Sequence, residues 1–153
     1  MSYNSSAQIY VTNNTGGNAI IAFSHEYSDD GPQIWNQPNT VIAPGQSAGP
    51  LAVGFNTGVF YTGRDYWFCG IQVLDGPNAG YYATEGSLEA PSKQCMLESE
   101  DNGATLYFSV TTETFVMTEN SGSCSTGMNA GNATALIAQQ AKKEERAKEQ
   151  KVA

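Results

Sequence analysis

Hydrophobic and polar side chains alternate with a period of two over most of residues 7–119. Ile9 and Val11 fall on one side of residues 7–12, and the same alternation recurs over residues 106–111 and continues through Phe115 and Met117. Successive side chains of a strand point to opposite faces, so this spacing predicts strands with one buried face. About ten such segments, separated by turn residues, predict an all-β fold, an antiparallel β-sandwich. No helical periodicity appears before residue 132.

Asparagine, glycine and proline mark the predicted turns. Residues 13–18 read Asn-Asn-Thr-Gly-Gly-Asn, and asparagine and glycine tolerate the positive φ that hairpin loops need. We therefore expect the chain to turn here and to return as a strand over residues 19–24. Pro44-Gly45 has the residue order of a type II turn.

Residues 65–74 are apolar on both faces, which predicts a strand in the middle of a sheet. Its core-facing residues would be Trp67, Cys69, Ile71 and Val73. Cys69 is then expected to be a buried thiol that packs as a small hydrophobic residue.

The chain changes character at residue 132. Residues 132–153 hold strong helix formers and no aromatic residue, glycine or proline, which predicts a charged α-helical tail. Upstream of the tail we expect a disordered N-terminus over residues 1–6, a β-sandwich domain over 7–126 and a linker over 127–131.

The charge follows the same division. The formal net charge is −8, made up of −10 over residues 1–131 and +2 over residues 132–153. An acidic body argues against nucleic-acid binding, which relies on cationic side chains to displace counterions from phosphates. No apolar run is long enough for a transmembrane helix, and the first residues lack the pattern of a signal peptide. A cytoplasmic or leaderless secreted protein is therefore expected.

Residues that could support catalysis are few. His25 is the single histidine and is expected at the surface, and no C-x-x-C motif suggests a zinc site. Cys95 and Cys124 are placed to lie close in space; a secreted chain would bond them, whereas without a leader reduced thiols are favoured. Glu98 and Glu100 would share one face of an alternating strand, which leaves a glycosidase geometry open. On balance, a non-enzymatic protein is predicted.

Two acidic loops are candidates for calcium binding, because calcium takes several oxygen ligands from such loops. A sandwich can bring two loops together at one rim. The alternative is that these segments, Asp-Asp-Gly and Asp-Asn-Gly, are simply good turns. The candidate metal ligands are Asp29, Asp30, Glu98, Glu100 and Asp101.

Aromatic residues surround one of the two basic residues of the body. Arginine beside tyrosine and tryptophan can hold a phosphate, sulfate or carboxylate while the rings stack on a sugar or a choline group. The alternative is that Arg64 pairs with Asp65 or another acid. The candidate ligand-binding residues are Trp35, Tyr61, Arg64, Tyr66, Tyr81 and Tyr82.

Four stretches resemble one family of small acidic domains from fungi and nematodes, named for up-regulation in long-lived nematode insulin-receptor mutants. They are Val53–Gly58, Thr62–Phe68, Val73–Gly80 and Cys95–Gly103, and the likeness extends over about residues 7–126. The resemblance implies a domain boundary before the tail and no catalytic residue. In size and in its aromatic strand followed by Cys-Gly, the chain is more distantly similar to the aegerolysin- and actinoporin-like sandwiches that bind membrane lipids.

These observations predict a recognition module that binds a glycan or a lipid head group through its rim loops and an aromatic strand, with calcium as a possible cofactor. The alternative is a structural protein that self-assembles into a homo-oligomer through its sheet edges or its helical tail.

Overall fold

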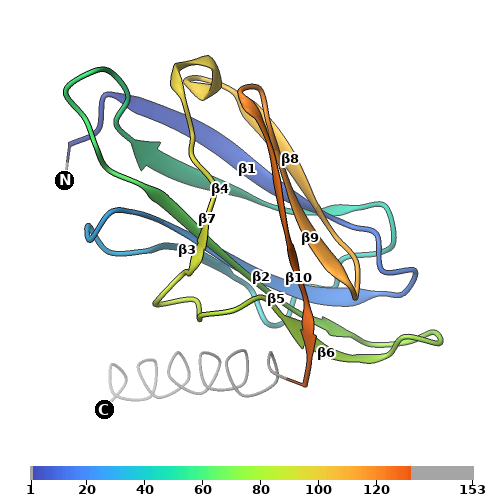
Figure 1. The fold of residues 1–153 in the computed structure, drawn as a ribbon. Coiled ribbons are helices and arrows are strands. Elements are labelled where there is room, and N and C mark those ends of the chain that lie inside the picture. Colours follow the sequence, from blue (N-terminus) through green and yellow to red (C-terminus); the bar gives the residue numbers. More distant parts are fainter. Residues whose placement is uncertain (1, 132–153) are drawn as a thin grey trace, which may run out of the picture.

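The computed structural model describes residues 2–131, which form two β-sheets packed face to face in a sandwich-like arrangement without a closed barrel (Figure 1). The first sheet has the strand order β10-β9-β8-β1-β4, with β1 Ser5–Asn13, β4 Ser47–Phe55, β8 Thr105–Val110, β9 Thr114–Glu119 and β10 Gly122–Gly127. The second has the order β11-β6-β5-β2-β3, with β2 Ala19–Tyr27, β3 Gln33–Asn36, β5 Asp65–Val73, β6 Gly80–Ala83 and β11 Asn129–Ala130. A short strand β7, Lys93–Gln94, pairs with β5.

The alternation of hydrophobic residues predicted these strands correctly. Ile9 and Val11 of β1 are fully buried, as are Phe115 and Met117 of β9. Between the sheets these side chains form a single hydrophobic core. The all-β class is therefore confirmed for the described residues, in which the one helical turn is the 3₁₀ turn η1, Ser99–Asp101.

Strand β5 is central in its sheet, as predicted, with β2 on one side and β6 and β7 on the other. Trp67, Cys69, Ile71 and Val73 face the core. Phe68 points the other way and is also fully buried, in a second cluster with Ala22, Ala83 and Leu88. The strand is apolar on both faces because each face is covered.

The strands connect differently from the prediction in two respects. The segment after β1 does not close a hairpin, because β1 and β2 lie in different sheets. In addition, β1 pairs with β8 in parallel, so the first sheet is not purely antiparallel. Between β1 and β8 the chain passes through the second sheet. No short hairpin therefore forces these two strands to be antiparallel.

Asn13 directs the crossing from β1 to β2. It is fully buried, and its Nδ2 donates hydrogen bonds to the carbonyl oxygens of Gly17 and Ile42, both at 2.8 Å. Its Oδ1 accepts from the Thr15 hydroxyl at 2.7 Å. Further on, Gln46 N donates to Ala43 O at 2.9 Å and Gly45 has a φ of 82°, which confirms the predicted turn at Pro44-Gly45.

Strands are found nearer to both ends of the chain than predicted. Ser5 and Ser6, placed in a disordered N-terminus by the sequence, are the first residues of β1. Asn129 and Ala130, placed in a linker, pair with β6. The predicted helical tail, residues 132–153, lies outside the described residues. None of residues 2–131 belongs to a helix of the length and hydrophobicity that crossing a bilayer requires.

Candidate functional site

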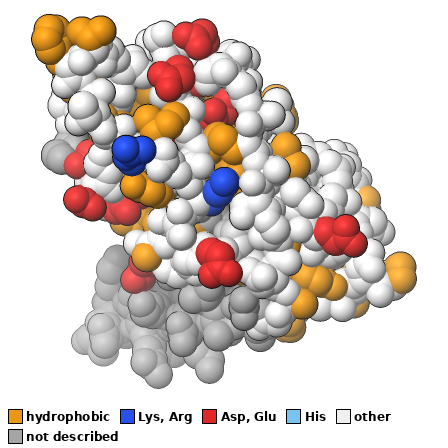
Figure 2. All heavy atoms as spheres, viewed as in Figure 1, with side chains coloured by type: hydrophobic (Ala, Val, Ile, Leu, Met, Phe, Trp, Pro, Cys, Tyr) orange, Lys and Arg blue, Asp and Glu red, His pale blue; other side chains and the backbone are white. Residues whose placement is uncertain are grey.

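The loop between β4 and β5, residues 56–64, carries an apolar tip. Val59 is 91% exposed, Phe60 92% and Tyr61 51%. Tyr61 N donates to Gly58 O at 3.1 Å, which closes a tight turn that leaves Val59 and Phe60 at its outer positions. In Figure 1 this loop is the green one at one extreme of the sandwich, and Figure 2 shows a hydrophobic projection at the same place.

The base of the loop is anchored on both sides. Asn4 Nδ2 donates to Thr57 O at 2.9 Å, and Thr57 N returns a hydrogen bond to Asn4 Oδ1 at 3.0 Å. On the other side, Ser28 N donates to Arg64 O at 2.7 Å and Arg64 N donates to Ser28 Oγ at 3.2 Å. The tip therefore projects from a fixed base.

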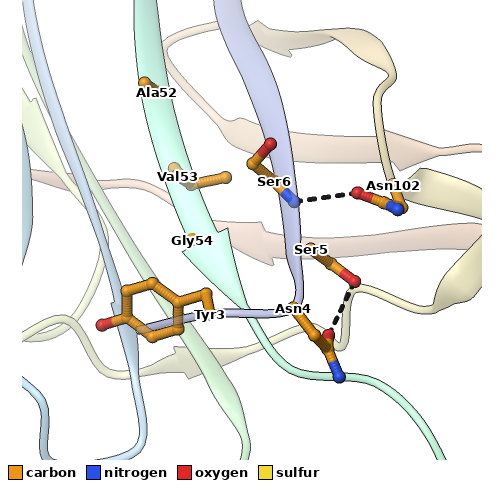
Figure 3. Close-up of a pocket in the computed structure, with 8 residues that line it drawn as sticks. All are labelled: Tyr3, Asn4, Ser5, Ser6, Ala52, Val53, Gly54 and Asn102. Atoms are coloured by element: carbon orange, nitrogen blue, oxygen red, sulfur yellow. Dashed lines mark hydrogen bonds between the residues drawn. The ribbon is translucent and has the colours of Figure 1, made fainter. Parts of the chain in front are cut away.

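A hollow of about 370 Å³ lies beside this base. Figure 3 shows the polar side chains of Asn4, Ser5, Ser6 and Asn102 along it, and the Tyr3 ring beyond the edge of β4. Asn102 Oδ1 accepts a hydrogen bond from Ser6 N at 3.0 Å. All residues lining the hollow are uncharged: Tyr3, Asn4, Ser5, Ser6, Ala52, Val53, Gly54 and Asn102.

The N-terminal segment passes over β4 at Gly54, and this crossing needs a residue without a side chain. A Cβ atom at Gly54 would overlap the Tyr3 ring, so a side chain there would displace the segment that carries Asn4. The Tyr3 ring in turn makes an edge contact with Tyr27, with centroids 6.0 Å apart. Burial, and then the neighbouring charge of Asp30, raises the pKa of the Tyr3 hydroxyl.

Arg64 is exposed and, within residues 2–131, forms no ion pair. The alternative considered from the sequence, pairing with Asp65, is wrong, because the Asp65 carboxylate is fully buried and bonded elsewhere. The guanidinium is thus available for an anion beside the apolar tip.

The other predicted ligand-binding residues are not gathered at one place. Trp35 stacks on Phe23 at a centroid distance of 5.8 Å and packs, like Tyr82, against the main core. Tyr81 packs against the second cluster on the opposite face of its sheet. Tyr66, half-buried, sits opposite Gln94 and Glu26 in the register of β5. Of the six candidates, Tyr61 and Arg64 belong to the loop.

The predicted acidic cluster is likewise dispersed. Asp101 is fully buried and accepts hydrogen bonds from Glu98 N at 2.9 Å, Asn120 N at 2.8 Å and Ser121 Oγ at 2.6 Å, which makes it a structural residue. Asp29 and Asp30 lie in the β2–β3 loop. Within residues 2–131, no group of three or more His, Cys, Asp or Glu side chains is placed to hold a metal ion.

Glu98 and Glu100 do not lie on a strand, so the shared face expected from the sequence does not exist. They flank Ser99 at the 3₁₀ turn, whose first-turn acids are Glu100 and Asp101. Asp-Asn-Gly therefore acts here as a turn, which was the alternative to calcium binding for this segment.

His25, expected at the surface, is fully buried. Strand β2 runs three residues further than predicted, which places His25 on the same inward face as Ile21 and Phe23. Its Nε2 lies 2.6 Å from Asp65 Oδ1 and its Nδ1 lies 2.7 Å from Gln33 Oε1. Leu97 N donates to the other Asp65 oxygen at 3.0 Å, so the pair is satisfied within the core.

Cys95 and Cys124 are joined by a disulfide. Their predicted proximity is confirmed, while the preference for reduced thiols differs from the structure. The bond connects β10, at the edge of the first sheet, to the segment after β7 of the second. Cys69 is the free cysteine of the described region, and burial raises the pKa of its thiol.

Three residues of functional interest are not among the site residues predicted from the sequence. Phe60 begins the aromatic stretch around Arg64, but neither it nor Val59 is a predicted ligand-binding residue, although an apolar pair between Gly58 and Gly63 is unusual for a loop. Glu119 was also missed; it follows Phe115 and Met117 at the same spacing of two, so the alternation itself places it on the inward face.

Two packed sheets and an anchored, apolar-tipped loop, on a body with a formal charge of −10 over residues 1–131, define a small acidic all-β domain. The chain belongs to the family described as Up-Regulated in long-lived daf-2, whose model matches residues 3–85. The matched residues include the whole loop and most of the hollow beside it. They end before Cys95, Asp101 and Glu119. No curated protein matches the chain.

Proposed function

We propose that this protein is a non-enzymatic recognition module that binds zwitterionic phospholipid surfaces by inserting the tip of the 56–64 loop. The observation that carries the proposal is the exposure of Val59 and Phe60, at 91% and 92%. Large apolar side chains that project from a fixed base find a favourable environment at the boundary of head groups and acyl chains. Burying one of them contributes about 1.5–3 kcal/mol.

Charge selects the kind of surface. Residues 1–131 carry a formal charge of −10, and an anionic membrane would repel such a domain. A zwitterionic head group avoids this repulsion and still offers a phosphate, to which the exposed Arg64 guanidinium can donate. The uncharged hollow lined by Tyr3 and Asn4 lies beside the loop and suits a head group without net charge.

A glycan is a weaker candidate for this end of the molecule. Sugar recognition would rely on several exposed rings on one surface, whereas Trp35 and Tyr82 pack against the main core and Tyr81 against the opposite face. Self-assembly is the remaining alternative, because the same apolar tip would also be buried against a second copy.

Replacing Val59 and Phe60 together by serine is expected to lower binding to phosphatidylcholine vesicles at least about thirtyfold, because most of the apolar area available for insertion is lost. Arg64→Ala is expected to weaken binding a few-fold. Cosedimentation with the vesicles measures both effects.

The control is Leu74→Ser. Leu74 is 40% exposed and follows the opposite end of β5, roughly 30 Å from the loop, so it should leave binding unchanged. Wild-type protein that does not sediment with the vesicles would refute the proposal. Light scattering without lipid tests the alternative: dimers that disappear in the Val59/Phe60 variant would favour self-assembly.

A further inference from the structure

A second hollow, of about 320 Å³, lies at the edge of the sandwich where the disulfide joins β10 to the segment after β7. Both cysteines line it, together with Glu98 and Glu119. The two residues differ in burial, because Cys95 is 2% exposed whereas Cys124 is only half-buried. The more exposed residue of the pair, Cys124, is therefore the point of attack considered for a reagent in the hollow.

Glu119 lies next to the sulfur of Cys95, the more buried residue of the pair. Its Oε1 is 3.6 Å from Cys95 Sγ, and its Oε2 is buried without a hydrogen-bond partner among the described residues. The residue as a whole is 8% exposed. An ionised carboxylate in this place would lack compensation for its lost hydration, so the geometry favours the protonated acid.

The groups that face Glu119 are acidic. Burial is the main cause that raises the pKa of Glu119, to about 9, and the carboxylates of Asp101, Asp65 and Glu98 act in the same direction. The Ser121 hydroxyl opposes them. With its pKa raised in this way, Glu119 carries a proton at neutral pH.

We propose that the Cys95–Cys124 disulfide is a site of reversible thiol exchange, at which a small thiol attacks Cys124 and Glu119 protonates the departing Cys95 sulfur. The incoming thiolate forms a new S–S bond with Cys124 Sγ as the old bond breaks. The electron pair of the old bond stays on Cys95 Sγ, which takes the proton of Glu119. The sulfur of the reagent is oxidised and Cys95 is reduced, so no other oxidant or reductant takes part.

The Glu119 carboxylate recovers its proton from water. Attack of Cys95 on the mixed disulfide then re-forms the Cys95–Cys124 bond and releases the thiol, whereas a second thiol molecule releases Cys124, departs as the disulfide of the reagent and leaves both cysteines reduced. Glu98 sets a preference among thiols, because its carboxylate at the hollow repels an anionic reagent and attracts a cationic one. A thiol that carries an amine is therefore the favoured class of substrate.

The experiment uses the full chain with cysteamine, which is cationic, and mercaptoethanesulfonate, which is anionic. Formation of the mixed disulfide is followed by mass spectrometry after quenching with iodoacetamide. The wild-type rate, divided by the concentration of the thiolate form of the reagent, should fall as pH rises through about 9, where Glu119 loses its proton. Glu119→Gln should be at least about tenfold slower at pH 7 and should lose this fall, since a positioned acid typically contributes a hundredfold or more.

Glu98→Gln is the matched control, because Glu98 lines the same hollow, whereas the contact with Cys95 Sγ is made by Glu119. This variant should keep a fall in rate at alkaline pH, displaced to lower pH because the Glu98 carboxylate helps to raise the pKa of Glu119, and should react faster with mercaptoethanesulfonate. Glu119→Asp retains an acid at a greater distance and should be slower than wild type while keeping a fall at alkaline pH. Equal rates and profiles for wild type and Glu119→Gln, or an adduct on Cys95 in place of Cys124, would overturn the proposal.

Discussion

Glu119→Gln is expected to stabilise the folded protein by roughly 3 kcal/mol at pH 7. The pKa of Glu119 is raised from 4.5 to about 9 by burial and by the neighbouring carboxylates. At pH 7 the side chain is therefore ionised in the unfolded chain and protonated in the folded one, so folding must take up a proton. Glutamine has the shape of the protonated acid and folds without that cost.

The difference in the free energy of unfolding between Glu119→Gln and the wild type depends on pH, because the pKa of Glu119 is higher in the folded chain than in the unfolded one. Below about pH 4.5 the acid is protonated in both states, so the variant has little advantage. As pH rises from 4.5 to about 9, only the unfolded chain loses the proton, and the free energy of unfolding of the wild type falls relative to the variant. Above about 9 the difference is constant.

Urea denaturation of both proteins between pH 4 and pH 9.5, with the disulfide intact, measures the difference. Glu113→Gln is the control, since Glu113 lies exposed in the turn between β8 and β9 and should change the free energy of unfolding by less than about 0.5 kcal/mol. A variant that is no more stable than wild type at pH 8 would mean that Glu119 is ionised in the folded state.

Asp101→Ala is expected to cost about 3–5 kcal/mol in the free energy of unfolding. The Asp101 carboxylate joins the η1 turn to the turn between β9 and β10, since it accepts from Glu98 N, from Asn120 N and from both the amide and hydroxyl of Ser121. Alanine would leave these part-buried hydrogen bonds without their acceptor. The two turns would then lose the group that holds them together.

Thermal and urea denaturation test this prediction, with Glu100→Ala as the neighbouring control. Glu100 is exposed and lies in the same 3₁₀ turn, so its removal should change stability by less than about 1 kcal/mol. Equal losses for the two variants would show that the turn, and not the buried carboxylate, accounts for the effect.

The alternation of hydrophobic residues predicted the local features of the fold, which are the strands and their buried faces. The alternation around Ile9, and the two apolar faces around Trp67, correctly gave strands and their buried sides, because side-chain direction in a strand is fixed by a period of two. The same period explains the buried ionisable residues. His25, Asp65 and Glu119 each sit in phase with hydrophobic neighbours, and the surface position predicted for His25 was wrong because its phase is that of Ile21 and Phe23.

The long-range arrangement could not be obtained in this way. Nothing near β1 states that its neighbours are β4 and β8, or that β8 runs parallel to it. The burial of Asp101 could not be predicted either, because Asp-Asn-Gly forms a turn whether its carboxylate faces water or three backbone amides. The candidate loop was found only in part, since the exposure of Val59 and Phe60 depends on the anchoring of its base by Asn4, more than fifty residues earlier.

The parallel pairing of β1 with β8 also has a consequence for synthesis on the ribosome. β1 takes β4 as its antiparallel partner on one side, whereas its other partner, β8, begins at Thr105. A nascent chain that has emerged only as far as residue 85, where the family match ends, contains two of the five strands of the first sheet. One edge of β1 then stays open to pairing with other chains until β8, Thr105–Val110, has emerged to close it.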